Sequence, residues 1–128
     1  MALLDDIGTY LANAGLVDGV SGWTLYKSYL PDQPDQAVGL FETGGDPPDQ
    51  SEGTRVDVLT FQLRVRGKKL KYDEAHTKIL AIFNALNDAD ISGYVYIYGM
   101  QAGPIPLGYD VDERPELSIN FECMKERS

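Results

Sequence analysis

The chain of 128 residues contains one cysteine and one histidine, and this scarcity limits the chemistry open to it. Cys123 cannot form a disulfide within the chain, so an oxidising compartment is not implied. It falls on the inward side of an alternating segment, where a small buried apolar side chain is expected rather than a nucleophile. His76 has no second candidate ligand nearby, so the sequence does not indicate zinc. We expect this histidine on the surface of a helix.

Motifs for nucleotide binding and nucleophilic catalysis are also missing. No segment has the spacing of a phosphate-binding or dinucleotide-binding glycine loop, and residues 19–22 lack the final glycine spacing of a nucleophile elbow. Two groups of loop carboxylates could hold a hard cation, but neither has the EF-hand pattern, and we expect both to be solvated. These groups are Asp46, Asp49 and Glu52, and Asp110, Asp112 and Glu113. The sequence therefore predicts no metal, no cofactor and no enzymatic activity.

Basic residues are few, because 11 Lys and Arg stand against 20 Asp and Glu and give a formal net charge of −9. Phosphate contacts need Lys and Arg, so this balance argues against adhesion to nucleic acid or to an anionic membrane. It does not argue against a passage along which DNA slides. No window approaches the ~20 apolar residues of a membrane span, and Asp5 and Asp6 argue against a signal peptide. The length suits one domain, residues 1–128.

The clearest pattern is a strand followed directly by a helix. From Val56 to Arg66 the residues alternate between an apolar and a polar side, as in a strand with one buried face. The apolar side consists of Leu59, Phe61, Leu63 and Val65. From Tyr72 to Asn87 apolar residues recur at intervals of three and four, the stripe of an amphipathic helix, with Asp73 and Glu74 in the first turn. We expect the strand face and the helix stripe to bury each other at the centre of the core.

Further elements are predicted on both sides of this pair. A first helix is expected over Met1–Ala14, and strands at residues 23–30, 37–42, 94–98 and 116–124. On the strand at 94–98, Tyr94, Tyr96 and Tyr98 are expected to share one side. Such a side either packs against a neighbouring strand or meets another chain. Residues 43–54 and 103–114 read as irregular. The first is either a surface loop or a segment that becomes ordered against a partner.

Several of these segments, taken together and in order, resemble the tail terminator or minor capsid proteins of long-tailed bacteriophages. The likeness covers most of the chain. It is carried by YKSYLPDQPDQAVGLFETGG (Tyr26–Gly45), VLTFQLRVRG (Val58–Gly67), YDEAHTKILAIFNAL (Tyr72–Leu86) and GPIPLGYDVDERPELSINFEC (Gly103–Cys123). In that family a Pro-Asp turn leads to a short strand and a Gly-Gly loop, and an Asp…Arg-Pro stretch introduces the last strand.

This resemblance implies an α+β fold and a structural role in the virion. The fold is a mostly antiparallel sheet with helices packed on one side, here Met1–Ala14 and Tyr72–Asn87. Such proteins assemble in the host cytoplasm as a ring, commonly a hexamer, that caps the tail tube, stops its growth and joins the tail to the head connector. DNA passes through the lumen. The implied partners are further copies of the chain, the tail tube protein and a head-side connector protein, with no membrane and no specific nucleic-acid binding.

Candidate contact residues follow from the polar strand faces and the loops. For the subunit interface they are Gln62, Arg64, Arg66, Tyr94, Tyr96 and Tyr98. For docking loops they are Asp46, Asp49, Glu52, Asp110, Asp112 and Arg114. Two other functions remain open at this point: a head-closure or other connector component, and a small cytoplasmic module that binds a ligand through residues 43–54 or the tyrosine side.

Overall fold

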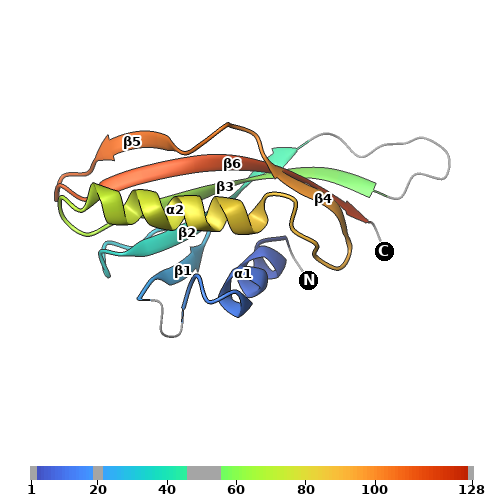
Figure 1. Cartoon of the computed structure of the whole chain (residues 1–128), viewed down its shortest axis with the longest axis horizontal. Helices are drawn as coiled ribbons and strands as arrows, with labels where there is room; N and C mark the ends of the chain where they lie inside the picture. Colours follow the sequence, from blue (N-terminus) through green and yellow to red (C-terminus); the bar gives the residue numbers. More distant parts are fainter. Residues whose placement is uncertain (1–2, 19–21, 46–55, 127–128) are drawn as a thin grey trace.

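The computed structural model describes residues 3–18, 22–45 and 56–126, which form two helices and one six-stranded sheet (Figure 1). The elements in chain order are α1 (Leu3–Asn13), β1 (Thr24–Lys27), β2 (Ala37–Gly45), β3 (Val56–Arg66), α2 (Tyr72–Leu86), β4 (Tyr94–Gly99), β5 (Ile105–Tyr109) and β6 (Pro115–Glu126). The fold is therefore α+β, as expected. Neither described helix is long and apolar enough to cross a membrane.

The sheet is built around β3 and β6, which pair antiparallel at eleven successive positions from Val56 with Glu126 to Arg66 with Glu116. β2 lies along the other edge of β3, and β1 pairs with β2 in the one parallel arrangement of the described sheet. The far edge of β6 is shared by two strands. β4 pairs with its second half and β5 with its first half, so β4 and β5 form the outer edge of the sheet.

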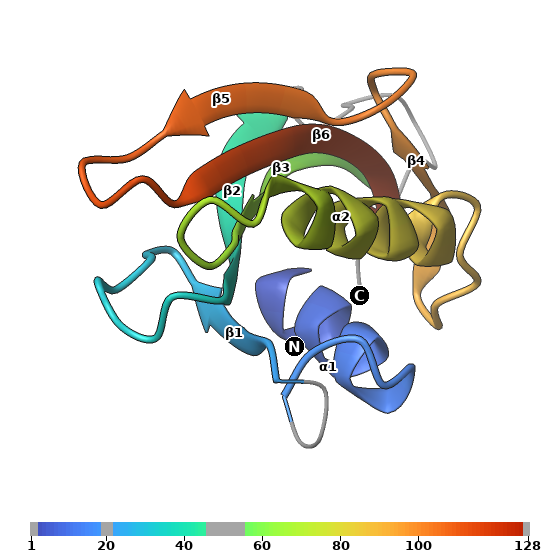
Figure 2. The same cartoon turned by 60° about the vertical axis from the view of Figure 1, so that its left-hand side comes forward.

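The core lies between the inward side of this sheet and the two helices. Both helices lie beneath the arch of β3 and β6 in Figure 2. Side chains from α1, α2 and the sheet belong to one cluster of buried apolar residues, and at its centre the rings of Phe61 and Phe121 stack with centroids 5.2 Å apart. The α2 stripe contributes Ala75, Ile79, Ile82 and Leu86. The predicted burial of the β3 face against the α2 stripe is thus confirmed.

Helix α1 contains a glycine because it lies against β1 at short distance. A Cβ atom at Gly8 would lie 2.7 Å from Cδ2 of Leu25, so with a larger residue the Leu25 side chain would have to shift. The helix ends before Gly15, whose φ of +76° is the left-handed conformation that stops a helix. The sequence predicted this stop, and it predicted the helix itself to within one or two residues.

The structure corrects several boundaries. Residues 103–114 were expected to be irregular, but they contain β5. The strand expected over 23–30 is limited to Thr24–Lys27, and β2 continues past Glu42 to Gly45. The part of the predicted 43–54 loop that follows Gly45 lies outside the described residues. The final strand and the strand at 56–66 are confirmed.

Candidate docking surfaces

The side of β3 that faces away from the core is a half-buried polar surface, here called the outward sheet face. The register places Gln62 between Phe41 on β2 and Asn120 on β6. One row further along, Thr60 lies beside Glu122, and the hydroxyl of Thr43 donates a hydrogen bond to the Thr60 hydroxyl at 2.7 Å. Amides, hydroxyls and one aromatic ring thus lie side by side on this face, a composition suited to contact with another protein surface.

Arg64 carries the positive charge at the centre of the outward sheet face. Its guanidinium carbon lies 5.4 Å from the centroid of the Phe41 ring, a cation–π contact. No acceptor among the described residues receives a hydrogen bond or an ion pair from this guanidinium, and its Nε is buried without a partner. Because charged groups normally find partners when they are shielded from water, Arg64 is suited to an acceptor outside the subunit.

Tyr96 and Tyr98 share a single carboxylate at the β4 side of the same face. The Tyr96 hydroxyl donates to Oε2 of Glu122 at 2.9 Å and the Tyr98 hydroxyl donates to the same oxygen at 2.7 Å. Burial, together with this hydrogen bond, raises the pKa of Tyr96 to about 12. The hydrogen bond to Glu122 is also the main cause that raises the pKa of Tyr98. Both phenols therefore stay neutral at physiological pH, and their rings lie next to each other with centroids 5.3 Å apart.

Tyr94 does not share this side of β4, contrary to the sequence prediction. The register shifts between Tyr94 and Tyr96, so strict alternation fails at Val95 and Tyr94 turns inward with Ile97. The Tyr94 side chain is 9% exposed, and its hydroxyl donates to Oδ2 of Asp6 on α1 at 2.8 Å. Burial and this bond raise the pKa of Tyr94. Its role is to tie β4 to α1.

Arg66 was expected on the polar, outward side of β3, but its side chain is 4% exposed. Its guanidinium donates to the carbonyl oxygens of Pro31 at 2.6 Å, Pro34 at 2.7 Å and Asp35 at 3.0 Å. These carbonyls belong to the turn that precedes β2, so Arg66 fixes that turn against the end of β3. Burial is the main cause that lowers the pKa of Arg66. The sequence gave no signal for this contact, because its partners are backbone atoms about thirty residues away.

Arg114 holds the same turn from the other side. Its guanidinium is 4% exposed and pairs with Asp32 at 2.9 Å, with Asp110 at 2.8 Å and with Asp35 at 3.2 Å. Burial alone would lower the pKa of Arg114, but the hydrogen bonds that its guanidinium donates to these carboxylates raise it. Arg114 therefore stabilises the turn before β2 against the β5–β6 turn through charged hydrogen bonds. Arg114 and Asp110, proposed from the sequence as docking groups, are thus engaged inside the subunit.

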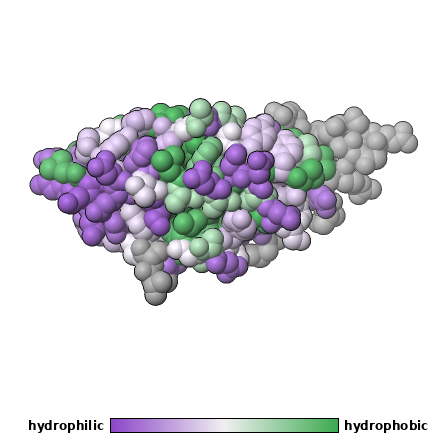
Figure 3. All heavy atoms as spheres, viewed as in Figure 1, coloured by the Kyte–Doolittle hydropathy of each residue, from purple (hydrophilic) through white to green (hydrophobic). Residues whose placement is uncertain are grey.

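The charged turns gather at one end of the molecule. The β3–α2 turn and the β5–β6 turn meet there, where the amide of Leu70 donates to the carbonyl of Glu113 at 2.9 Å. Figure 3 shows hydrophilic residues concentrated at this end, on the left in the view of Figure 1. No group of three His, Cys, Asp or Glu side chains in the described part could hold a metal ion. Asp46, Asp49 and Glu52 lie outside the described residues.

Exposed apolar side chains concentrate on the outer edge formed by β4 and β5. Nine large apolar side chains are exposed in the described part, and seven of them fall between Val95 and Val111. They are Val95, Tyr98, Met100, Ile105, Leu107, Tyr109 and Val111. All five residues of β5 are exposed. None of the contact residues expected from the sequence, apart from Tyr96, Tyr98 and Asp110, lies in this stretch, although its two prolines and three apolar residues in a short span are typical of an edge strand.

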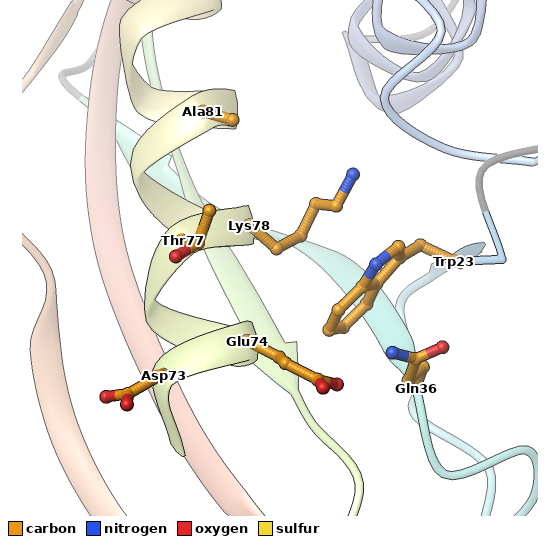
Figure 4. A pocket seen from close by; sticks show the side chains of 7 residues that line it. All are labelled: Trp23, Gln36, Asp73, Glu74, Thr77, Lys78 and Ala81. Carbon is orange, nitrogen blue, oxygen red and sulfur yellow. The ribbon is translucent and has the colours of Figure 1, made fainter. Parts of the chain in front are cut away.

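A groove of about 420 Å³ opens between α2 and the segment before β1 (Figure 4). Its floor is the Trp23 ring, with the ammonium nitrogen of Lys78 5.6 Å from the ring centroid. Lys78 Nζ donates to the carbonyl of Leu16 at 2.9 Å, and burial lowers the pKa of Lys78. Asp73 and Glu74 lie at the other end of the groove.

These surfaces can be compared with known proteins. A model of the family described as "Bacteriophage tail terminator protein" matches residues 10–127. The chain belongs to the bacteriophage tail terminator family. It is therefore a structural component of the phage tail, with a role in joining head and tail, and the resemblance drawn from the sequence is confirmed.

A solved structure supports the fold assignment. A chain from "Virion of native gene transfer agent (GTA) particle" superposes with a TM-score of 0.75 at 19% identity, covering 98% of this chain and 95% of that one. At this identity the likeness establishes a shared fold. No curated protein matches the sequence.

Proposed function

We propose that this tail terminator acts as a closed ring of identical subunits, with six copies expected. The ring caps the completed tail tube, stops its growth and binds the connector on the head side. The observation that carries the proposal is Arg64, a cation with no acceptor among the described residues, on a sheet face that no described helix covers. A residue of this kind is suited to an interface, where Arg is enriched and pairs with acids.

The subunit interface in this proposal uses Gln62, Arg64, Tyr96 and Tyr98. The two tyrosines supply apolar area with polar tips, and their shared Glu122 fixes the hydroxyls before contact, which reduces the ordering cost of association. Arg66 and Tyr94 are omitted from the interface because both are committed to contacts within the subunit. The exposed carboxylate of Asp112 remains a docking group for the tube or the connector.

The net charge of −9 is consistent with a lumen through which DNA passes. A ring multiplies the charge of its subunits, and like charge repels the DNA backbone. Such a passage lets the genome slide without being held. Specific nucleic-acid binding is not part of the proposed function.

The test uses purified tail tubes together with the purified protein. Tubes polymerised with the protein should stop at a defined length and carry a ring at one end in negative-stain images. Labelling the chain in intact virions should place it between tube and connector rather than within the connector. A protein that stays monomeric beside tail tubes and leaves their length unchanged would falsify the proposal.

A further inference from the structure

The outer edge formed by β4 and β5 has the composition of a buried contact but lies on the surface. Tyr98, Met100, Ile105, Leu107 and Tyr109 are between 39% and 54% exposed. Because β4 and β5 pair with successive stretches of β6, these residues follow one continuous edge of the sheet (Figure 1). Monomeric proteins rarely expose apolar patches beyond a few hundred Å². This edge therefore marks a contact with another protein. It is here called the β5 edge, with Val95 and Val111 included and with Tyr98 left to the outward sheet face.

The area of the β5 edge fits a subunit contact. Its six apolar residues, each between 39% and 97% exposed, together present on the order of several hundred Å², the scale of the ~800 Å² per partner of a standard interface. The edge does not invite an added strand, because Pro104 and Pro106 remove two amide donors from it. Contact through side chains is the remaining mode, and it limits uncontrolled edge-to-edge association.

The charge next to the β5 edge complements the outward sheet face. Glu113, in the turn that follows β5, is exposed and makes no ion pair within the described part of the chain. Arg64 is the matching cation. It has no acceptor within residues 3–18, 22–45 and 56–126, and it lies over the Phe41 ring on a face of amides and hydroxyls. One subunit thus carries an apolar edge with an acid that makes no ion pair in the described part, and next to this edge a polar sheet face with a base that has no acceptor there. Two different complementary surfaces on one chain are what a head-to-tail contact needs, and such contacts close into rings.

We infer that the β5 edge of one subunit packs on the outward sheet face of a second copy, with Glu113 paired to Arg64 across the contact. This inference rests on the proposed ring and names the surfaces that build it. Leu107 and Tyr109 supply the apolar area. The Glu113–Arg64 pair sets the direction of the contact, since it can form in only one order around the ring.

The experiment measures the oligomer by native mass spectrometry, for the free protein and with tail tubes. Leu107→Asp should lower the ring fraction at least about tenfold at equal concentration, because it places a charge in the contact. Tyr29→Asp is the matched control, since Tyr29 is 57% exposed and follows β1, at the opposite edge of the sheet from β4 and β5. It should assemble like the wild type. Thermal melts establish that both variants are folded.

A charge exchange tests the pairing separately. Arg64→Glu and Glu113→Arg should each weaken the ring, and the double variant should regain assembly because the pair is restored in reverse. Equal assembly of Leu107→Asp and Tyr29→Asp with the wild type, or equal loss in both, overturns the β5 contact, and failure of the double variant to recover overturns the pairing. In those cases a wild-type ring on tail tubes still stands as the function. A wild type that forms no ring removes both.

Discussion

Arg64 and Arg66 lie two residues apart on the same side of β3, yet only the guanidinium group of Arg66 has hydrogen-bond acceptors among the described residues. Arg66 donates to three backbone carbonyls of the turn before β2, at distances from 2.6 to 3.0 Å. Arg64 lies over Phe41 and has no acceptor in the described part. The strand pattern treats the two residues alike, and only the path of the distant turn separates them. One is a structural group and the other is available for contact between subunits.

The same charge reversal at the two positions should therefore have different results. Arg66→Glu places a carboxylate against carbonyl oxygens in a buried site and should lower the free energy of unfolding by about 3–5 kcal/mol. Arg64→Glu should change it by less than about 1 kcal/mol and act on assembly instead. Urea unfolding of both variants measures the difference. Equal destabilisation by the two substitutions would show that Arg64 is also a structural group.

Asp110 should make the protein sensitive to acid. Burial alone would raise the pKa of its carboxyl, but bonds from the Arg114 amide, the Arg114 guanidinium and the Asp112 amide lower it below 3.8. Because the folded pKa is the lower one, the stabilisation is complete above pH 3.8 and is lost as the pH falls through the folded value.

Asp110→Asn should consequently lower the free energy of unfolding at neutral pH. The further decrease in this free energy on acidification should be smaller in the variant than in the wild type. Urea unfolding at about pH 7 and about pH 3 gives the two differences. Asp112→Asn serves as the control, because this side chain is 60% exposed and its ion pair with Arg114 is longer, at 3.4 Å. A wild-type acid dependence that Asp110→Asn leaves unchanged would contradict the assignment.

The Tyr96–Glu122 contact should be visible in an alkaline titration. The folded pKa of Tyr96 is about 12, above the ordinary 10.0, so the neutral phenol contributes stability that is complete below pH 10.0 and lost as the pH rises to the folded value. Glu122→Gln removes the negative charge while burial persists. The pKa of Tyr96 should then fall part of the way toward 10.0, because burial still raises it. The pKa of Tyr98 should return closer to 10.0, because the hydrogen bond to Glu122 is the main cause of its shift. Tyrosinate absorbance measures both, and Tyr96→Phe and Tyr98→Phe identify which residue titrates. An unchanged curve in Glu122→Gln would show that the carboxylate is not the partner.

The secondary structure was predicted best where it depends on residues that are close together in the sequence. The alternation of Val56–Arg66 and the three-to-four spacing of Tyr72–Leu86 come from faces that pack within one strand or helix, so the bounds of β3 and α2 agree with the prediction. β5 was not predicted because its residues are all exposed and show no alternation of buried and exposed positions. Only its pairing with β6 makes it a strand, and that pairing is a tertiary contact.

The positions of the candidate contact residues in the fold were predicted less well for the same reason. In the sequence, Tyr94 follows the two-residue repeat of Tyr96 and Tyr98. In the structure, a bulge at Val95 places Tyr94 on the other side of β4. The partners of Arg114 include Asp32 and Asp35, some eighty residues away, so its burial has no local signature. Gln62, Arg64, Tyr96 and Tyr98 share the expected side because β3 and the rest of β4 are regular.

Leu63 tests the core itself. Its side chain is fully buried on the inward side of β3, opposite Leu40 and Ile119 on the paired strands. Leu63→Ala should lower the free energy of unfolding by about 2–5 kcal/mol, through lost burial and the cavity left behind. Gln62→Ala, next to it on the outward face, should cost far less. Urea unfolding compares them, and a loss below about 0.5 kcal/mol for Leu63→Ala would mean that the strand faces are reversed.

Cys123 offers a direct measure of how often this core opens. The thiol is fully buried on β6, and burial raises its pKa to about 12, so it is neither accessible nor ionised in the folded subunit. A thiol reagent should therefore modify it only through unfolded or widely opened molecules, at a rate set by the free energy of opening. Leu63→Ala should accelerate the modification about tenfold for each 1.4 kcal/mol that it removes. Rapid modification of the folded wild type would instead place Cys123 in a locally mobile strand. The wild type and Leu63→Ala would then react at similar rates.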